Sequence, residues 1–230
     1  GEIDVAEADK IVTGGRGIPE PSAEAVHETP WALLLRTPAV WAIVVGHFSN
    51  NWSLYVLLAW LPSYFKQTFG VSLANAGLLS AAPSLAMFIM ANVAGTLADR
   101  MIRTGSSVTF VRKLMQSIGL FGVATFLLLL PLATSAAAGM FLMCAATGTM
   151  AFTLAGFSPN CFDIAPRHAS VIWGISNTFA TIPGIVGVAV TGWLVQRTGG
   201  YTAAFVVTAS VAVAGGLFFL VAGSGERKIE

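Results

Sequence analysis

Long stretches without any charged residue are the feature that most constrains the fold of this chain. Asp, Glu, Lys and Arg are all absent from residues 67–98, 114–162, 168–196 and 198–225. A helix needs about 20 mostly apolar residues to cross the hydrocarbon core of a bilayer. The second stretch is long enough for two such helices, so the sequence predicts a chain that crosses a membrane several times.

Six segments have the length and apolarity of membrane-spanning helices. They are residues 39–65, 75–98, 110–131, 136–159, 170–195 and 202–222. The turn signal at residues 131–135 divides the longest charge-free stretch into two of them. Backbone groups in lipid need partners within the protein, which favours helices, and the alternating pattern of a β-barrel is absent. We therefore predict an all-α membrane protein; a buried soluble core is the weaker alternative.

Composition narrows the function classes further. Only 10% of the residues are charged, whereas soluble domains have about 25%. The net charge of +1 gives no indication of nucleic-acid binding. Cys144 and Cys161 match no metal-site spacing, and no nucleophile motif or Ser–His pair at helical spacing is present. We expect no catalytic residue, metal or cofactor, and an enzyme is the less favoured class.

Lysine and arginine are distributed unevenly around the predicted spans. Only Lys66 and Arg197 fall on one side of the membrane. The other ten fall on the opposite side: Lys10, Arg16, Arg36, Arg100, Arg103, Arg112, Lys113, Arg167, Arg227 and Lys228. Cytoplasmic connections carry an excess of basic residues, so this side and both chain ends are predicted to be cytoplasmic.

Polar side chains at helical spacing interrupt two of the predicted spans. They are His47, Asn50, Asn51 and Tyr55 in the first span, and Trp173, Asn177 and Thr181 in the fifth. Residues four apart share one face of a helix. Because polar groups in hydrocarbon are costly without partners, they either line a cavity that binds a polar solute or form hydrogen bonds between helices. Both interpretations remain open from spacing alone.

Charged residues near the predicted cytoplasmic face form two candidate gating groups. They are Gly95, Asp99, Arg100 and Arg103 after the second span, and Asp163 and Arg167 before the fifth. A carboxylate at a helix end can pair with arginine and latch one conformation, although the arginines could equally serve as membrane anchors. Asp163 and Arg167 are four residues apart, so they could pair locally, or Asp163 could cap the fifth span.

Two segments resemble known transporters. VAGTLADRMIR, residues 93–103, resembles the loop signature of the major facilitator superfamily. NCFDIAPRHASVIWGISNTFATIPGIVG, residues 160–187, resembles more specifically its anion:cation symporter family. That family includes sialin, the vesicular glutamate transporters, the plastid phosphate/anion transporters and bacterial sugar-acid transporters. The resemblance covers residues 38–228. It implies six transmembrane helices that form the C-terminal half of a twelve-helix major facilitator fold.

The same resemblance implies the domain organisation. Residues 1–37 would be the cytoplasmic linker between the two halves, residues 38–224 the six-helix bundle, and residues 225–230 a cytoplasmic tail. In that fold the halves rock about a central cavity, lined in this half by the first, second, fourth and fifth spans. The seven polar residues of the two stripes would bind substrate there, and the charged groups would form the gate.

The implied function is secondary active transport of an anion, either inorganic phosphate or a small organic or sugar acid, coupled to H⁺ or Na⁺. Asn50 stands where vesicular glutamate transporters have an arginine that meets the substrate carboxylate, which argues against glutamate. The expected partners are the lipid bilayer and the N-terminal six-helix half. The expected membrane is the inner membrane of a bacterium, or an organelle membrane such as that of a plastid or lysosome. An exchanger or uniporter is the alternative, and a non-transport membrane protein or enzyme a more remote one.

Overall fold

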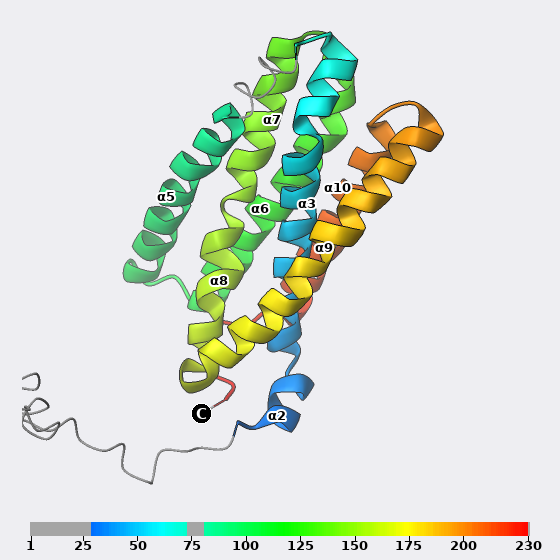
Figure 1. Ribbon diagram of the computed structural model, residues 1–230. Coiled ribbons are helices and arrows are strands. Elements are labelled where there is room, and N and C mark those ends of the chain that lie inside the picture. Colours follow the sequence, from blue (N-terminus) through cyan, green and yellow to red (C-terminus); the bar gives the residue numbers. More distant parts are fainter. Residues whose placement is uncertain (1–28, 73–80, 230) are drawn as a thin grey trace, which may run out of the picture. The chain divides into compact units, whose positions relative to one another are not determined.

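The computed structural model describes residues 29–72 and 81–229, and nearly all of these residues are helical (Figure 1). The chain from Ala32 onward forms one compact unit. Its helices are α2 (Trp31–Arg36), α3 (Pro38–Phe69), α5 (Ala81–Arg103), α6 (Val108–Leu129), α7 (Ala136–Met150), α8 (Thr153–Ile164), α9 (Ala169–Thr198) and α10 (Thr202–Ala222). The described residues contain no strand, so the all-α prediction is confirmed.

Five segments among the described residues are long and apolar enough to cross a membrane. They are Ala81–Arg103, Val108–Leu132, Ala136–Ile164, Pro166–Thr198 and Thr202–Ala222. Helix α3 has 32 residues but is not among the five. The polar run from His47 to Ser53 lies at its centre and lowers its hydropathy, which agrees with its absence from these five.

Helix ends follow recognisable local signals. Ser107 and Ser135 precede α6 and α7, and their hydroxyl oxygens accept hydrogen bonds from backbone N–H groups of the first turn. Gly70 and Gly199 end α3 and α9 in the left-handed region, with φ of 67° and 72°. These signals place the boundaries of the long spans near the predicted positions, and α10 matches its prediction at both ends.

The predicted fourth span is divided into two helices. Helix α7 ends at Met150 and α8 begins at Thr153. The hydroxyl groups of Thr147 and Thr149 donate to backbone carbonyls three or four residues earlier, a pattern that bends helices. The regular helix is interrupted at residues 151–152 in the middle of this span, where the chain has neither glycine nor proline.

Helix α3 lies at the centre of the bundle, in contact with α8, α9 and α10, while α6 packs against α7, α8 and α10 (Figure 1). Helix α5 packs mainly against α7. The end of the bundle where α5 and α8 finish and α6 and α9 start is called the basic end here. It holds Arg100, Arg103, Arg112, Lys113 and Arg167.

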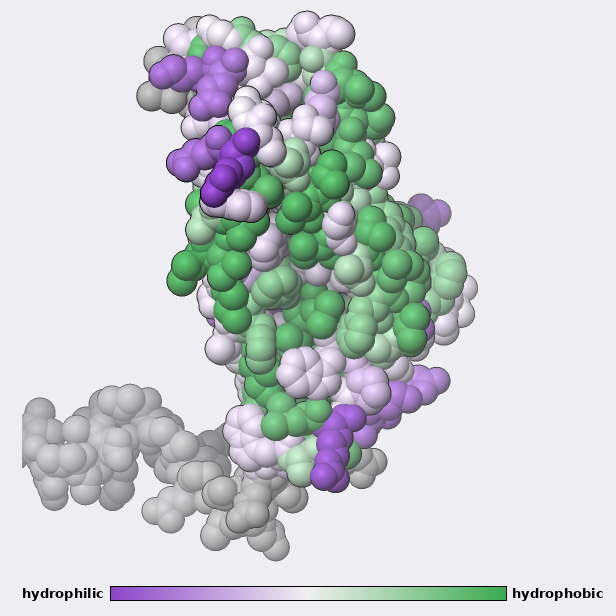
Figure 2. Space-filling view, turned by 90° about the vertical axis from the view of Figure 1, so that its right-hand side faces the viewer, coloured by the Kyte–Doolittle hydropathy of each residue, from purple (hydrophilic) through white to green (hydrophobic). Residues whose placement is uncertain are grey.

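The surface of the bundle agrees with insertion in lipid. Figure 2 shows one face whose middle is mostly hydrophobic, with the strongly hydrophilic residues lying mainly nearer its two ends. Large apolar side chains point outward along the helices, among them Phe88, Phe141, Ile185 and Val221, which are 67%, 70%, 79% and 85% exposed. Such a surface fits hydrocarbon and would be costly in water.

Candidate functional site

Helices α3 and α9 run in the same direction and pack against each other. His47 Nδ1 and Ser176 Oγ share a hydrogen bond of 2.9 Å, and Asn51 Nδ2 donates to the Ala180 carbonyl at 2.9 Å. Both pairs are 129 residues apart in sequence. Part of the polar stripe of the first predicted span therefore faces α9, and two of its residues, His47 and Asn51, form hydrogen bonds with that helix.

Glycines on α9 let aromatic residues of α3 approach closely farther along the same interface. A Cβ on Gly187 would lie 3.3 Å from the ring of Trp52, and a Cβ on Gly192 would lie 3.0 Å from Trp60. The indole N–H of Trp60 donates to the Val188 carbonyl at 3.2 Å. Small residues allow this tight helix packing inside a membrane.

His47 lies in an aromatic cluster at the junction of α3, α8 and α9. Its ring stacks on Phe157 with centroids 4.5 Å apart and on Trp173 with centroids 5.2 Å apart. The side chain is 6% exposed. Three helices therefore meet around one imidazole, and any movement of α8 or α9 relative to α3 must change its contacts.

Asn50 extends the polar network towards the break between α7 and α8. The hydroxyl group of Thr153 donates to Asn50 Oδ1 at 2.8 Å and also lies 2.8 Å from the Met150 carbonyl. Asn50 Nδ2 donates to Asn51 Oδ1 at 3.1 Å. The network thus joins α3, α8 and α9 near the middle of the bundle, as buried polar groups require.

The remaining predicted binding residues differ in exposure. Asn177 and Thr181 are exposed on α9, whereas their neighbours Ser176 and Ala180 are buried against α3. Tyr55 is half-buried. The structure thus brings His47, Asn50, Asn51 and Trp173 together in one cluster and leaves Asn177 and Thr181 on an open face of α9.

A second group of polar contacts lies at the basic end. Arg112 Nε donates to Asp163 Oδ2 at 2.7 Å, and its Nη1 donates to the Ala155 carbonyl at 3.1 Å. That carbonyl is available because Pro159, four residues later, has no N–H to donate to it. The guanidinium of Arg112 therefore joins α6 to two groups of α8, which are the Asp163 carboxylate and the Ala155 carbonyl that Pro159 leaves without a helical partner.

This pairing corrects both predictions made for Asp163 from sequence. The carboxylate pairs with Arg112 instead of the nearby Arg167, which is exposed and has no ion pair with any described residue. It does not cap the fifth span either, because α9 begins after His168 without a side-chain cap. A three-residue 3₁₀ turn, Pro166–His168, separates Asp163 from α9 and removes the helical i, i+4 geometry.

Gly95 and Asp99 line a cavity of about 330 Å³ at the basic end, together with Arg112 and Ser158. Asp99 is exposed, and a Cβ on Gly95 would meet no atom within 4 Å. This cavity therefore brings part of the predicted gating group next to the Arg112–Asp163 pair. We call this cavity and the Arg112–Asp163 pair together the basic-end latch.

Arg100 and Arg103 lie apart from that cavity. Arg100 lines a separate surface hollow of about 390 Å³ on α5. Arg103 Nε donates to the backbone carbonyl of Asp99 at 3.3 Å, so it contacts the main chain and not the carboxylate. Both side chains are exposed, which suits the anchoring interpretation of the sequence.

Several polar residues of the site were not singled out from sequence. Gln116 is fully buried on α6, and its Oε1 accepts from the Phe157 backbone N–H at 3.1 Å. Arg112 and Gln116 are one helical turn apart, and this i, i+4 spacing was the available signal. Thr153 and Ser176 left weaker signals, because hydroxyl side chains are common in membrane spans.

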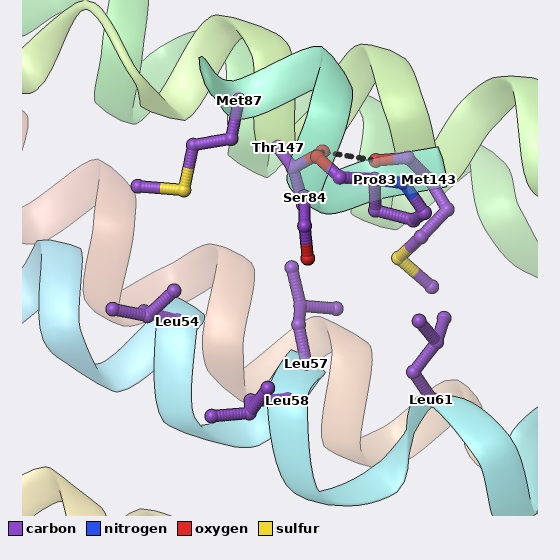
Figure 3. Close-up of a pocket in the computed structure, with 9 residues that line it drawn as sticks. All are labelled: Leu54, Leu57, Leu58, Leu61, Pro83, Ser84, Met87, Met143 and Thr147. Atoms are coloured by element: carbon purple, nitrogen blue, oxygen red, sulfur yellow. Dashed lines mark hydrogen bonds between the residues drawn. The ribbon is translucent and has the colours of Figure 1, made fainter. Parts of the chain in front are cut away.

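An apolar pocket of about 70 Å³ lies between α3, α5 and α7, nearer the other end of the bundle. Figure 3 shows leucines of α3 pointing toward Pro83, Ser84 and Met87 of α5 and toward Met143 and Thr147 of α7. Thr147 Oγ1 also lies 3.0 Å from the Pro83 carbonyl oxygen, so its single proton is shared between that acceptor and the Met143 carbonyl of its own helix. Leucine and methionine side chains dominate the lining, so this pocket does not fit a charged solute. Among the residues that the structure describes, no three His, Cys, Asp or Glu side chains gather as metal ligands.

Comparison with known proteins defines the class of molecule. The profile of the Major Facilitator Superfamily matches residues 6–188, and the chain belongs to this family of membrane transporters. It is a multi-pass membrane protein, and the prediction that it is not an enzyme is confirmed by its family. The described helices are consistent with the C-terminal half of this fold, as the resemblance implied.

Individual relatives are named as anion transporters. The chain is 38% identical over 99% of its length to "Probable anion transporter 4, chloroplastic" of Oryza sativa subsp. japonica, and covers 38% of that protein. It is 38% identical over 97% of its length to "Ascorbate transporter, chloroplastic" of Arabidopsis thaliana, covering 40% of it. It is 38% identical over 91% of its length to "Sodium-dependent phosphate transport protein 1, chloroplastic" of the same plant, covering 41%. The chain thus spans about two fifths of the length of these relatives.

A solved structure shows the same fold. A bacterial homologue of the human lysosomal transporter Spinster, in an inward-facing and occupied conformation, aligns with a TM-score of 0.59 at 16% sequence identity. The alignment covers 81% of this chain and 49% of that one. Half of a transporter chain therefore corresponds to the described bundle.

Proposed function

We propose that this chain forms half of a secondary transporter that carries small anions, either inorganic phosphate or organic acids, across a membrane. The observation that carries the proposal is 38% identity, over 91–99% of the chain, to relatives named as anion, ascorbate and phosphate transporters. A polar network inside lipid-spanning helices supports it, because such residues persist mainly where function requires them.

The substrate path runs beside α9, where Asn177 and Thr181 are open and Tyr55 is half-buried. Amide and hydroxyl groups donate hydrogen bonds to an oxyanion without fixing its identity. The wall behind this path is held together by His47, Asn50, Asn51 and Trp173. The contacts of these residues change when the helices that form the wall move. The other half of the transporter completes the cavity and supplies its cationic groups and the coupling carboxylates. The described spans contain only two carboxylates, those of Asp99 and Asp163, and both lie at the basic end.

The basic-end latch is the gate in this proposal, and the basic end faces the cytoplasm. Ten of the twelve basic residues of the chain fall on this side by sequence, which supports the assignment. Arg112 and Asp163 hold α6 against α8, and Asp99 lines the cavity beside them. The chloroplastic names of the relatives favour an organelle membrane if the host is a plant.

Coupling to H⁺ or Na⁺ is the preferred mode, and exchange or uniport on the same scaffold is the alternative. The test uses the full-length transporter in proteoliposomes, with labelled inorganic phosphate as the probe and organic acids as competitors. Uptake that requires an imposed pH or Na⁺ gradient supports symport. Uptake that needs only an internal anion supports exchange. Absence of any anion-dependent flux from folded protein would overturn the proposal.

A further inference from the structure

The segment after α10 folds back across the basic end of the bundle. The backbone N–H groups of Lys228 and Ile229 both donate to the Ile164 carbonyl, at 2.8 and 3.1 Å. Ile164 is the last residue of α8, and carbonyls at this position need partners from outside the helix. Residues 224–229 therefore complete the C-terminal end of α8.

The side chains of this segment divide into one buried anchor and an exposed charged stretch. Ile229 is 1% exposed and belongs to the apolar cluster that includes Leu34, Cys161 and Ile164. Glu226 and Lys228 are exposed and lie 2.9 Å apart, and the hydrogen bond from Lys228 lowers the pKa of the Glu226 carboxyl. A single isoleucine thus anchors the segment under the cluster.

A glycine lets the segment pass against the first turn of α6. The Gly225 N–H donates to Thr109 Oγ1 at 2.8 Å. A Cβ at Gly225 would lie 2.6 Å from the Thr109 backbone nitrogen and 2.8 Å from the Val108 carbonyl carbon. Backbone atoms at a helix start cannot move aside easily, so a larger residue at Gly225 would push the segment away from α6.

Asn160 links the segment to the charged pair. Its Nδ2 donates to the Ser224 carbonyl at 2.8 Å and lies 3.4 Å from Asp163 Oδ2, the oxygen that Arg112 also contacts. Asn160 is fully buried, so it has no water to replace either contact. A change in the position of Ser224 must therefore shift Asn160 and alter its contact with Asp163.

We propose that residues 224–229 form a strap that keeps the basic-end latch closed, with Asn160 as the positioning residue between strap and latch. Release of the strap removes one partner of Asn160, exposes the cluster under Ile229 and lets α8 move away from α6. This proposal depends on the proposed transport function only where it concerns the effect of the strap on transport. Its effect on conformation can be measured without any substrate.

The first experiment follows the native Cys161 thiol in the full-length protein, using a water-soluble maleimide and peptide mass spectrometry. The wild-type thiol, 1% exposed, should react slowly. Ile229→Glu should raise its rate about tenfold or more, because a carboxylate at this buried position favours the released state. Ile229→Val should retain the slow rate, and Glu226→Gln is the exposed control. Equal rates in the Ile229→Glu variant and the wild type would overturn the strap.

Gly225→Ala provides a second route if Ile229→Glu fails to fold. Its matched control is Gly200→Ala, where an added Cβ meets no atom within 4 Å. The strap predicts faster Cys161 labelling in Gly225→Ala and no change in Gly200→Ala. The reverse order, or no difference between the two, would contradict it.

The second experiment tests the link from strap to latch. A cysteine introduced by Ser158→Cys reports on the cavity that Asp99 and Arg112 line. Ile229→Glu and Asn160→Ala should each speed its labelling severalfold, and the double variant should add little, since both interrupt one path. If Ile229→Glu frees Cys161 but leaves Ser158→Cys labelling unchanged, the strap is merely structural and the proposal fails.

Discussion

Gly215 of α10 lies directly against the side chain of Ser49 on α3, so closely that a Cβ at Gly215 would come within 2.6 Å of the Ser49 Cβ. Both residues lie on spans that contact each other along their length, and Ser49 is 2% exposed. No space exists there for even one methyl group. Packing around α3 is thus tight on its α10 side as well as on its α9 side.

Gly215→Ala should therefore destabilise the bundle by about 1–3 kcal/mol, the usual cost of overpacking. Gly174→Ala is the control, because a Cβ there meets no atom within 4 Å. The control should be neutral or stabilise by up to about 1 kcal/mol through helix propensity. Thermal unfolding in one detergent measures both, and equal melting temperatures would contradict the close contact.

Arg112→Ala should lower stability more than Asp163→Asn. The arginine side chain is 10% exposed and serves both the carboxylate and the Ala155 carbonyl, so its loss leaves that carbonyl without its donor and leaves Asp163 with the 3.4 Å contact from Asn160. Loss of one partner from a buried pair costs about 3 kcal/mol. Asparagine at 163 keeps one acceptor for Arg112. The exposed Arg103→Ala serves as control, and an Arg103→Ala effect as large as that of Arg112→Ala would refute the assignment.

Asp99→Asn should impair transport while expression and folding stay near wild type. Asp99 is exposed in the cavity of the latch and has no ion pair with a described residue, so its charge contributes little to stability. If the charge helps to hold one conformation, phosphate flux in proteoliposomes should fall about tenfold, equivalent to 1.4 kcal/mol. Arg100→Gln, on the neighbouring hollow, should have a smaller effect. A wild-type rate in Asp99→Asn would remove it from the gate.

Cysteines on the two polar stripes should differ in reactivity. Asn177→Cys and Thr181→Cys should react readily with a water-soluble reagent, because both positions are exposed on α9. Asn50→Cys should react at least tenfold more slowly, because Asn50 is 3% exposed between α3 and α8. An anion substrate should protect position 177. If position 50 reacts as fast as position 177, water reaches the buried network in the membrane-embedded protein, and the prediction is wrong.

The sequence predicted most of the fold because membrane spans depend on long-range composition. Charge-free runs located the helices, and α10 was predicted at both ends. The break at residues 151–152 was missed, because neither glycine nor proline stands there, and hydroxyl bonds to the preceding turn like those of Thr147 and Thr149 also occur in unbroken helices such as α10. The second predicted span began at residue 75, and residues 73–80 lie outside the described part of the chain.

The site was harder to predict, because helical spacing shows which residues share a face but not what that face meets. His47 and Asn51 were correctly placed on one face, yet only the structure shows that this face meets α9 with a 129-residue offset. Asp163 was paired with Arg167 or a helix terminus because both are near in sequence. Its partner, Arg112, is 51 residues away, and no local pattern could indicate it. The functional roles of these residues remain predictions.

Counterflow of labelled inorganic phosphate in proteoliposomes tests the central claim most directly, because it needs no gradient and no knowledge of the coupling ion. The full-length transporter, loaded with unlabelled phosphate, should accumulate labelled phosphate transiently and saturably, and small organic acids should compete. Asp99→Asn should slow this exchange, whereas Arg103→Ala should leave it nearly unchanged. If folded, reconstituted protein shows no counterflow of phosphate or of any small organic acid, the chain is not part of an anion transporter.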